Sequence, residues 1–329
     1  MSADIPVAVV IPVLNRASRI AAAIRAALAQ SHPDCIVVVV DDGSRDGSWA
    51  EMCRFAGEDR VALIRLKRNL GTAQAKNVAL LLTGGRAVSF HDSDDRPHPD
   101  KLLRQARVLG QGGLSGDAGL NWRVIGRAPG AALQIDAVFC HHELILPDGG
   151  RRIIRRELAL FDDLFPNAQP EQAPGDWLHI NSGLFHPRVF REIGGYADSI
   201  EEDRDLRNRL LCAGQILRVI EEPLLTKIET ADSLTQSPET GYTSARRRAD
   251  REAVWRDIDL WFRTRQIPPR AISVPADAVA EIIRPALLAP SAALADSATA
   301  AARDIWLARA SAAQGPAQSP AELAGQAKR

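Results

Sequence analysis

The sequence predicts an α/β protein in which helices flank a mostly parallel central sheet. Short β-branched segments alternate with segments of helical periodicity throughout the first 110 residues, which is the pattern of repeated β-α-β units. The chain has 329 residues, enough for one large α/β domain or two small ones. Hydrophobic residues make up 46% and charged residues 25%, a mixture that is typical of a globular protein and excludes a fibrous or disordered chain.

Each strand and helix of the first half is predicted from its own pattern. Val7–Val13 is a continuous apolar run, which is typical of a strand buried on both faces. In residues 16–30, Ile20, Ile24 and Leu28 lie on one helical face. By the same reasoning, strands are predicted at 36–40, 61–66 and 87–90, and helices at 48–55, 72–82 and 99–109.

The carboxyl ends of these strands are the expected location of a binding site. Right-handed crossovers between parallel strands bring the segments after the strands to one edge of the sheet, where ligands bind. Asn15, residues 41–42 and the acidic run at 92–95 all follow strands in this way.

The second half is less regular. Strands are predicted near 120–125 and 133–139, and helices at 153–164, 187–193 and 202–213. A further helix begins near Thr243 and combines several arginines with an aromatic face of Trp255, Trp261 and Phe262. This helix could contact an anionic membrane, cover a cleft, form a dimer interface or pack on the core.

Charge and cysteine usage narrow the class of protein. The formal net charge is zero, because 41 basic residues balance 41 acidic ones, and this argues against a nucleic-acid partner. Cys35, Cys53, Cys140 and Cys212 lack C-x-x-C spacing, which indicates reduced thiols rather than a disulfide or zinc framework. No apolar run reaches the ~18–20 residues that span a bilayer, and no basic segment of a signal peptide begins the chain. We therefore expect a soluble cytoplasmic protein.

An acidic motif, Asp-Ser-Asp-Asp at 92–95, directly follows the strand at 87–90. Three carboxylates within four residues repel one another unless a cation or hydrogen-bond donors compensate them. Mg²⁺ or Mn²⁺ with oxygen ligands is the usual compensation, often shared with substrate phosphates. The alternative is a solvated acidic turn in which Asp92 or Asp95 caps a helix.

Two further acidic segments have a functional and a structural interpretation. The loop at 41–47 fails as a calcium loop, because its twelfth position counted from Asp42 is Cys53 rather than glutamate. Asp42 could instead accept hydrogen bonds from a base or ribose, or the loop is a plain strand–helix turn. Residues 201–205 begin a helix, where the dipole favours acidic residues, and one of these carboxylates could be a general base.

Taken in order, the motifs resemble glycosyltransferase family 2, the inverting enzymes of Rossmann-like GT-A fold that use nucleotide-sugar donors. The matching segments are 9–15, 38–44 with Asp46 and Gly47, 69–71, 75–77, 90–95, 181–185 with Phe190, 194–196 and 202–206. The resemblance covers roughly residues 5–235.

The resemblance implies the site residues. The nucleotide is expected to contact Pro12, Leu14, Asn15, Asp42, Lys76 and Ser93. The DXD motif is expected to hold Mn²⁺ or Mg²⁺ through Asp92, Asp94 and Asp95. The donor and acceptor sugars are expected near Asn181, Ser182, Gly183 and Glu202, and the catalytic base is expected to be Asp203.

Three positions depart from the family pattern. Leu14 stands where an aromatic residue commonly stacks on uracil, and Lys76 replaces an arginine, which keeps the charge but loses the bidentate fork. The segment 230–235 lacks the histidine of many relatives. Either this metal ligand is missing or an oxygen of Glu229, Thr230 or Asp232 replaces it.

The function implied is metal-dependent inverting transfer of a hexosyl or N-acetylhexosaminyl group from a nucleotide diphosphate sugar, with UDP favoured. The acceptor would be a hydroxyl of a saccharide or a lipid-linked glycan in polysaccharide or glycoconjugate synthesis. One alternative is a sugar-nucleotide pyrophosphorylase or nucleotidyltransferase, but residues 15–18 lack its Gly-rich basic loop. Another alternative is an inactive module that binds nucleotide sugars.

The domain organisation follows from these assignments. Residues 1–235 would form the GT-A catalytic domain, with a nucleotide-sugar half at 1–110 and an acceptor half at 111–235. Residues 236–314 are predicted to be a helical C-terminal extension, which could give peripheral contact with the inner face of the membrane or a homodimer. The Gly/Pro/Gln/Ser-rich tail at 315–329 is predicted to be disordered.

Overall fold

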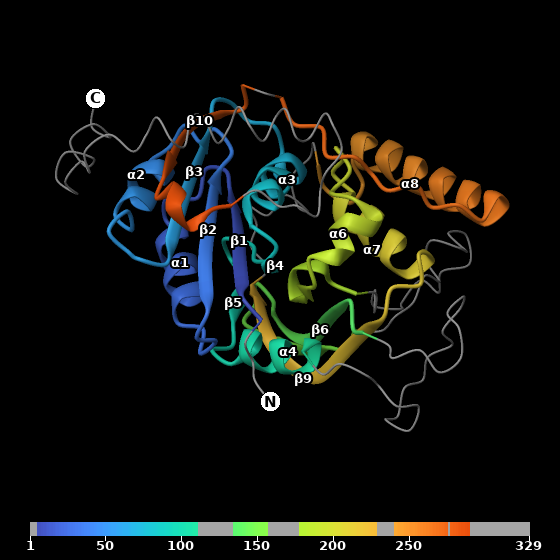
Figure 1. Cartoon of the computed structure of the whole chain (residues 1–329), viewed down its shortest axis with the longest axis horizontal. Helices are drawn as coiled ribbons and strands as arrows, with labels where there is room; N and C mark the ends of the chain where they lie inside the picture. The colour runs from blue at the N-terminus through green and yellow to red at the C-terminus, as the bar shows by residue number, and fades with distance from the viewer. Residues whose placement is uncertain (1–4, 111–133, 157–177, 229–239, 276, 290–329) are drawn as a thin grey trace.

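A single large sheet organises the protein, shown in Figure 1 as a computed structural model. The structure describes residues 5–110, 134–156, 178–228, 240–275 and 277–289. The strands are β1 (Val7–Val13), β2 (Cys35–Asp41), β3 (Val61–Leu66), β4 (Ala87–Phe90), β5 (Arg96–Pro97), β6 (Ala137–Ile145), β7 (Arg151–Ile154), β8 (Leu184–Phe185), β9 (Leu217–Ile228) and β10 (Val279–Ile283). Their order is β10-β3-β2-β1-β4-β8-β6-β9-β5, and β7 pairs with β6.

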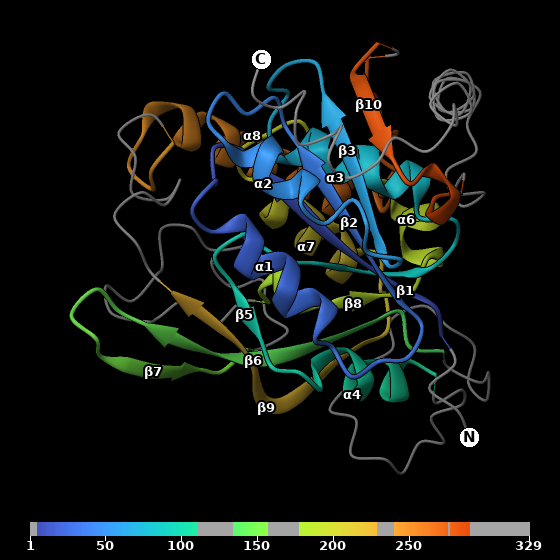
Figure 2. The same ribbon diagram turned by 90° about the vertical axis from the view of Figure 1, so that its left-hand side faces the viewer.

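Helices cover both faces of the sheet. They are α1 (Ile20–Leu28), α2 (Ser48–Cys53), α3 (Thr72–Leu82), α4 (Lys101–Leu109), α6 (Arg188–Ile193), α7 (Glu202–Cys212) and α8 (Ala245–Thr264), with 3-10 turns η1 (Ile180–Ser182) and η2 (Pro285–Leu287). Figures 1 and 2 show α1 and α2 on one face and α3, α6 and α7 on the other. The α/β class predicted from the sequence is therefore confirmed.

The strands β3, β2, β1 and β4 are parallel and buried on both faces. Along β1, Val7, Val9 and Ile11 pack in the core beneath α1, whereas Ala8 and Val10 pack in the core beneath α3. Because alternate side chains enter two apolar cores, the strand has no polar face, and its sequence is a continuous apolar run.

The second half of the sheet is mixed rather than parallel. The short strand β8 is antiparallel to both β4 and β6, and β6 is parallel to β9, with register shifts between Cys140 and His142. Figure 2 shows β6, β7 and β9 side by side at one end of the sheet. Because β8 pairs with both β4 and β6, it connects the two halves of the sheet and places α7 opposite the carboxyl ends of the parallel strands.

One secondary-structure prediction in this half was wrong. The segment at 153–164 was expected to be helical, but Ile153 and Ile154 belong to β7, which pairs with β6 in a hairpin. The turn contains Gly149 at φ +84°, a conformation that favours glycine. Residues 155–156 are not helical either, and residues 157–164, the strand expected at 120–125 and the tail at 315–329 lie outside the described residues.

The C-terminal third contributes both a helix and a strand. Val254, Ile258 and Trp261 of α8 form a small apolar cluster with Cys212 of α7. The chain then returns to the sheet, where β10 pairs antiparallel with β3 inside the segment that was expected to be helical. The domain boundary at residue 235 stays a prediction. Among the described residues, no helix has the length and apolar composition needed to cross a bilayer.

Gly194 lies at a close approach between α6 and the C-terminal segment, and we predict that Gly194→Ala strongly destabilises the protein. Its φ is +79°, and an added Cβ would lie 1.9 Å from the carbonyl oxygen of Arg270. The control Gly85→Ala also stands at a positive φ, +81°, but its added Cβ meets no atom within 4 Å. In urea unfolding we expect a loss of about 1 kcal/mol for Gly85→Ala and about 3–5 kcal/mol for Gly194→Ala. Equal losses of unfolding free energy in the two variants would show that the close contact with Arg270 does not contribute to stability.

Candidate active site

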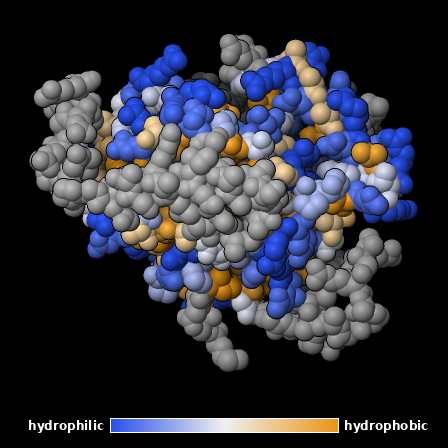
Figure 3. Space-filling view, turned by 45° about the horizontal axis from the view of Figure 1, so that its top comes forward, coloured by the Kyte–Doolittle hydropathy of each residue, from blue (hydrophilic) through white to orange (hydrophobic). Residues whose placement is uncertain are grey.

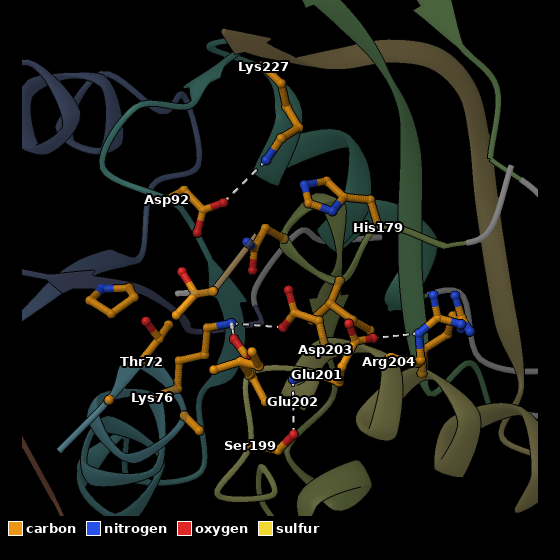
Figure 4. A pocket seen from close by; sticks show the side chains of 18 of the residues that line it. Thr72, Lys76, Asp92, His179, Ser199, Glu201, Glu202, Asp203, Arg204 and Lys227 are labelled. Carbon is orange, nitrogen blue, oxygen red and sulfur yellow. Dashed lines mark hydrogen bonds and ion pairs between the residues drawn. The ribbon is translucent and has the colours of Figure 1, made fainter. Parts of the chain in front are cut away.

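A cavity of about 620 Å³ opens at the carboxyl edge of the parallel strands. Its walls come from the segments after β1 and β4, from the start of α3, and from residues 178–181 and 198–204. The end of β9 and the start of α8 complete it. Figure 4 shows that the labelled acidic and basic side chains from these segments point toward one another. The sheet thus brings segments that are far apart in sequence to a single site.

The acidic loop after β4 lies against a partly buried cation of the chain itself. The Lys227 ammonium at the end of β9 lies 3.2 Å from Asp92 Oδ2 and 3.3 Å from Asp95 Oδ1. Burial raises the pKa of Asp95 to about 7, helped by Asp92 and Asp94 and opposed by Lys227. Burial would also raise the pKa of Asp92, but Lys227 and Lys76 lower it below its usual range.

Asp94 belongs to the same loop and lies at the edge of the cavity. Its carboxylate is partly exposed to the cavity and lies 3.9 Å from the guanidinium of Arg19. Burial and the neighbouring Asp92 raise the pKa of Asp94. Asp94 is therefore less closely paired with a basic group than Asp92 and Asp95 are.

Asp92, Asp95 and His179 form a group with the donor chemistry of a metal site. One ligand atom from each lies within 4.8 Å of the others. Burial holds the pKa of His179 well below its ordinary value, so the imidazole is neutral, and its Nε2 has no hydrogen-bond partner. Two carboxylates with a neutral imidazole suit Mn²⁺, and the oxygens suit Mg²⁺. These residues therefore fit a divalent cation.

A second cation, the buried Lys76 of α3, joins the cavity to α7. Its ammonium lies 2.8 Å from Asp203 Oδ1 and 3.3 Å from Glu202 Oε1, and it sits over the ring of Tyr196. Burial alone would lower the pKa of Lys76, but Asp203, Tyr196 and Glu202 raise it well above its ordinary value. The lysine is therefore charged.

Glu202 and Asp203 occupy different environments although they share Lys76. The Asp203 side chain is 34% exposed, whereas that of Glu202 is 13% exposed. Burial raises the pKa of Glu202 to about 7, with Asp203 adding to the effect and Lys76 opposing it. The more accessible carboxylate toward the cavity is that of Asp203.

Asp42 supports a wall of the cavity instead of lining it. Its two carboxylate oxygens accept hydrogen bonds from the backbone N–H groups of Leu70 and Gly71, at 2.6 and 2.9 Å. Burial raises the pKa of Asp42 to about 6 despite these bonds. Asn15, at φ +52°, similarly ties its own loop to the next one, since its side-chain oxygen accepts from the Arg45 N–H.

Part of the sequence is similar to a known protein family. Residues 8–144 match the family described as glycosyl transferase family 2. The chain thus contains a segment of glycosyltransferase family 2.

Three relatives illustrate the family. TuaG of Bacillus subtilis, named for teichuronic acid biosynthesis, is 37% identical over 31% of this chain and 41% of its own length. The succinoglycan biosynthesis protein ExoO of Rhizobium meliloti is 29% identical over 71% of this chain and 58% of its own. The Escherichia coli UDP-Glc:alpha-D-GlcNAc-diphosphoundecaprenol beta-1,3-glucosyltransferase WfgD is 30% identical over 34% and 44%. The matches thus span less than two thirds of each relative.

The predicted site residues divide into two groups. Those that line the cavity are Pro12, Lys76, Asp92, Ser93, Asp94, Asn181, Glu202 and Asp203. Those that do not line it are Leu14, Asn15, Asp42, Asp95, Ser182 and Gly183. Ser182 and Gly183 are packed behind it, where an added Cβ on Gly183 would lie 2.8 Å from the Phe139 and Phe185 rings.

Sequence reasoning missed His179 and Lys227. Both side chains line the cavity and face the acidic loop. His179 stands two residues before Asn181, and Lys227 is one of few lysines in an arginine-rich chain. These weak signals would have pointed to them. The segment 229–235, where a replacement metal ligand was expected, lies outside the described residues.

Because Glu202 is protonated more easily in the folded protein than in the unfolded chain, we predict that it makes stability fall as pH rises. Its pKa of about 7 lies above the ordinary value of 4.5, so its favourable contribution is complete below pH 4.5 and lost by pH 7. Relative to wild type, Glu202→Gln should gain roughly 2–3 kcal/mol of unfolding free energy across this range. Urea unfolding at a series of pH values measures it.

The difference between the two proteins isolates Glu202 from other groups. Burial also raises the pKa of Asp42 and Asp95, to about 6 and about 7, but both groups remain in the variant. Curves of stability against pH that stay parallel for the two proteins would contradict the prediction.

Proposed function

We propose that this protein is an inverting glycosyltransferase that transfers a hexosyl or N-acetylhexosaminyl group from a UDP-sugar to an acceptor hydroxyl. One observation carries the proposal. A single cavity holds the acidic loop after β4, the buried ammonium of Lys76 and the partly exposed carboxylate of Asp203. These are the groups that a sugar-nucleotide donor and an acceptor hydroxyl require.

The donor would lie between the loop after β1 and the acidic loop. Pro12, Leu70 and Ser93 line this part of the cavity, and Asp42 fixes the 70–71 backbone behind it. Mn²⁺ or Mg²⁺ would be held by Asp92, Asp95 and His179, with Asp94 at the rim. When bound, such an ion neutralises a diphosphate leaving group.

Asp203 is proposed as the general base. Lys76 holds its Oδ1 at 2.8 Å, which fixes the orientation of the carboxylate beside the cavity. Asp203 would accept the proton of the acceptor hydroxyl as the hydroxyl oxygen attacks the anomeric carbon from the face opposite the leaving group. This single displacement inverts the configuration and needs no nucleophile from the protein.

The names of the relatives support the substrate classes. WfgD is named for transfer from UDP-Glc to a diphosphoundecaprenol-linked sugar, and TuaG and ExoO are named for polysaccharide biosynthesis. By extension, we propose a saccharide or lipid-linked acceptor in polysaccharide or glycoconjugate synthesis. No specific observation favours a pyrophosphorylase or an inactive binding module.

We expect the wild type to bind UDP in the presence of Mn²⁺ and to release UDP slowly from a UDP-sugar. Asp203→Asn should bind UDP with nearly unchanged affinity, because the amide keeps the oxygen that faces Lys76. Its rate of UDP release should fall by about 10²–10⁴-fold, since the general base is lost. Calorimetry measures binding, and a panel of UDP-glucose, UDP-galactose, UDP-N-acetylglucosamine and GDP-mannose measures turnover.

Asp198→Asn is the matched control, because Asp198 also lines the cavity but has an exposed side chain. It should leave turnover close to wild type. An equal loss of UDP binding in Asp203→Asn would make Asp203 a donor-binding residue. Failure of the wild type to bind any of the nucleotides would refute the transferase proposal.

We also propose that the protein acts in the cytoplasm, in peripheral contact with the inner face of the membrane through α8. The four cysteines are free, as in reducing compartments. Away from the cavity, α8 exposes Arg256 and Arg263 together with Phe262 and Leu260, which are 46% and 48% exposed, and Arg263 pairs with Asp259. Figure 3 shows hydrophobic residues scattered among hydrophilic ones on the face of the molecule that it presents. Exposed arginines beside apolar side chains suit peripheral binding to an anionic membrane.

The double variant Leu260→Ala, Phe262→Ala should co-sediment less with phosphatidylglycerol vesicles than wild type does, by about tenfold, because apolar area is lost. Ile153→Ala is the control, since Ile153 is 62% exposed but lies on β7, away from α8. Unchanged sedimentation would contradict membrane contact. A monomer–dimer equilibrium that only the double variant shifts, seen by ultracentrifugation, would support a homodimer through α8 instead.

A further inference from the structure

We propose that the Lys227 ammonium holds the cation position of the acidic loop, and that a divalent cation binds by displacing it. Lys227 would then set the affinity of the site for metal. The inference deepens the proposed function and rests on it, because that function places a divalent cation beside Asp92 and Asp95.

The contacts of Lys227 are those of a cation in the metal position. Its Nζ lies 3.2 Å from Asp92 Oδ2 and 3.3 Å from Asp95 Oδ1. These are the same two carboxylates that approach His179 in the metal-type group. Figure 4 shows Lys227 pointing toward Asp92, with His179 beside them. A metal ion and the ammonium therefore compete for the same two side chains.

The charges of the acidic loop explain why a divalent cation can displace the Lys227 ammonium. The loop carries three carboxylates, at positions 92, 94 and 95; Lys227 lies within 4 Å of two of them, and Arg19 lies 3.9 Å from the third. Asp95 is 4% exposed, and the Lys227 ammonium, 3.3 Å from its Oδ1, is the cation that compensates it. A doubly charged ion compensates the loop more completely.

The surroundings of Lys227 allow the exchange without movement of the backbone. Lys227 pairs with Leu144 in the β6–β9 ladder, which fixes its Cα, while its side chain is 25% exposed and lines the cavity. Once released, the ammonium can turn into the space proposed for the donor and pair there with a diphosphate oxygen. Metal binding would thus prepare the site for the donor.

The wild type and two variants at position 227 test this competition with Mn²⁺ alone. The affinity for Mn²⁺ is measured from the electron paramagnetic resonance signal of the free ion. Lys227→Met should bind Mn²⁺ about tenfold or more tightly than wild type, because the competing charge is gone. Lys227→Arg should bind it more weakly than wild type, because a guanidinium holds two carboxylates more firmly than an ammonium does. The matched control Lys67→Met removes a surface lysine that pairs with Asp277 and should match wild type.

Thermal unfolding in increasing Mn²⁺ provides a second readout and shows that each variant is folded. A ligand that binds only the folded state raises the Tm, so Lys227→Met should gain Tm at lower Mn²⁺ concentrations than wild type. If Lys227→Met binds Mn²⁺ no better than wild type, the ammonium is not a competitor and the proposal is wrong. Tighter binding by Lys227→Met with equal binding by Lys227→Arg and wild type would indicate simple repulsion without displacement, which also overturns it.

The outcomes separate this proposal from the proposed function. If no protein of the series binds Mn²⁺ but the wild type binds UDP, displacement is refuted while donor binding stands, and Lys227 is a permanent substitute for the metal. If Mn²⁺ binding follows the expected order but no nucleotide binds, the exchange is supported and the transferase proposal fails.

Discussion

The buried ammonium of Lys76 joins the two halves of the protein. It stands on α3, in the parallel half, and pairs with Asp203 and Glu202 at the start of α7, in the mixed half. Removing a charged lysine from water costs several kcal/mol, which is offset only where its partners are held in good geometry. The fold supplies this geometry because β8 joins the two halves of the sheet and brings α7 across from α3. The position of the proposed base therefore depends on a buried charge as well as on the apolar packing of Leu206 and Leu210 of α7.

A second layer of ion pairs extends this arrangement to the C-terminal third. Glu201, 5% exposed, accepts from Arg204 and from Arg247 and Arg251 of α8. Asp205 likewise pairs with Arg209 and with Arg270, whose backbone contacts Gly194. Acidic residues at the start of a helix need no more than the helix dipole to explain them. Here they also attach α8 to the wall of the cavity.

The parallel half could be predicted from sequence because its signals are local. The apolar run of β1 and the four-residue spacing in α1 depend on neighbours along the chain, and both elements form where the pattern predicted them. The hairpin of β7 was missed because Arg151–Ile154 form a strand only by pairing with β6. Strand β10 was missed for the same reason, since its partner β3 lies more than two hundred residues earlier.

The sequence by itself determined the class of the fold, the family that it resembles and the acidic residues of the site. It indicated those residues because acidic motifs that follow strands must meet at one edge of a parallel sheet. Tertiary structure alone decided which of them share the cavity. It turned Asp42 toward the backbone of Leu70 and Gly71, and it brought His179 and Lys227 from distant segments to the loop of Asp92 and Asp95. Buried carboxylates are compensated by the hydrogen-bond donors and cations that the fold places within a few ångströms of them. Residues that are distant in sequence supply these groups, so local sequence spacing does not reveal them.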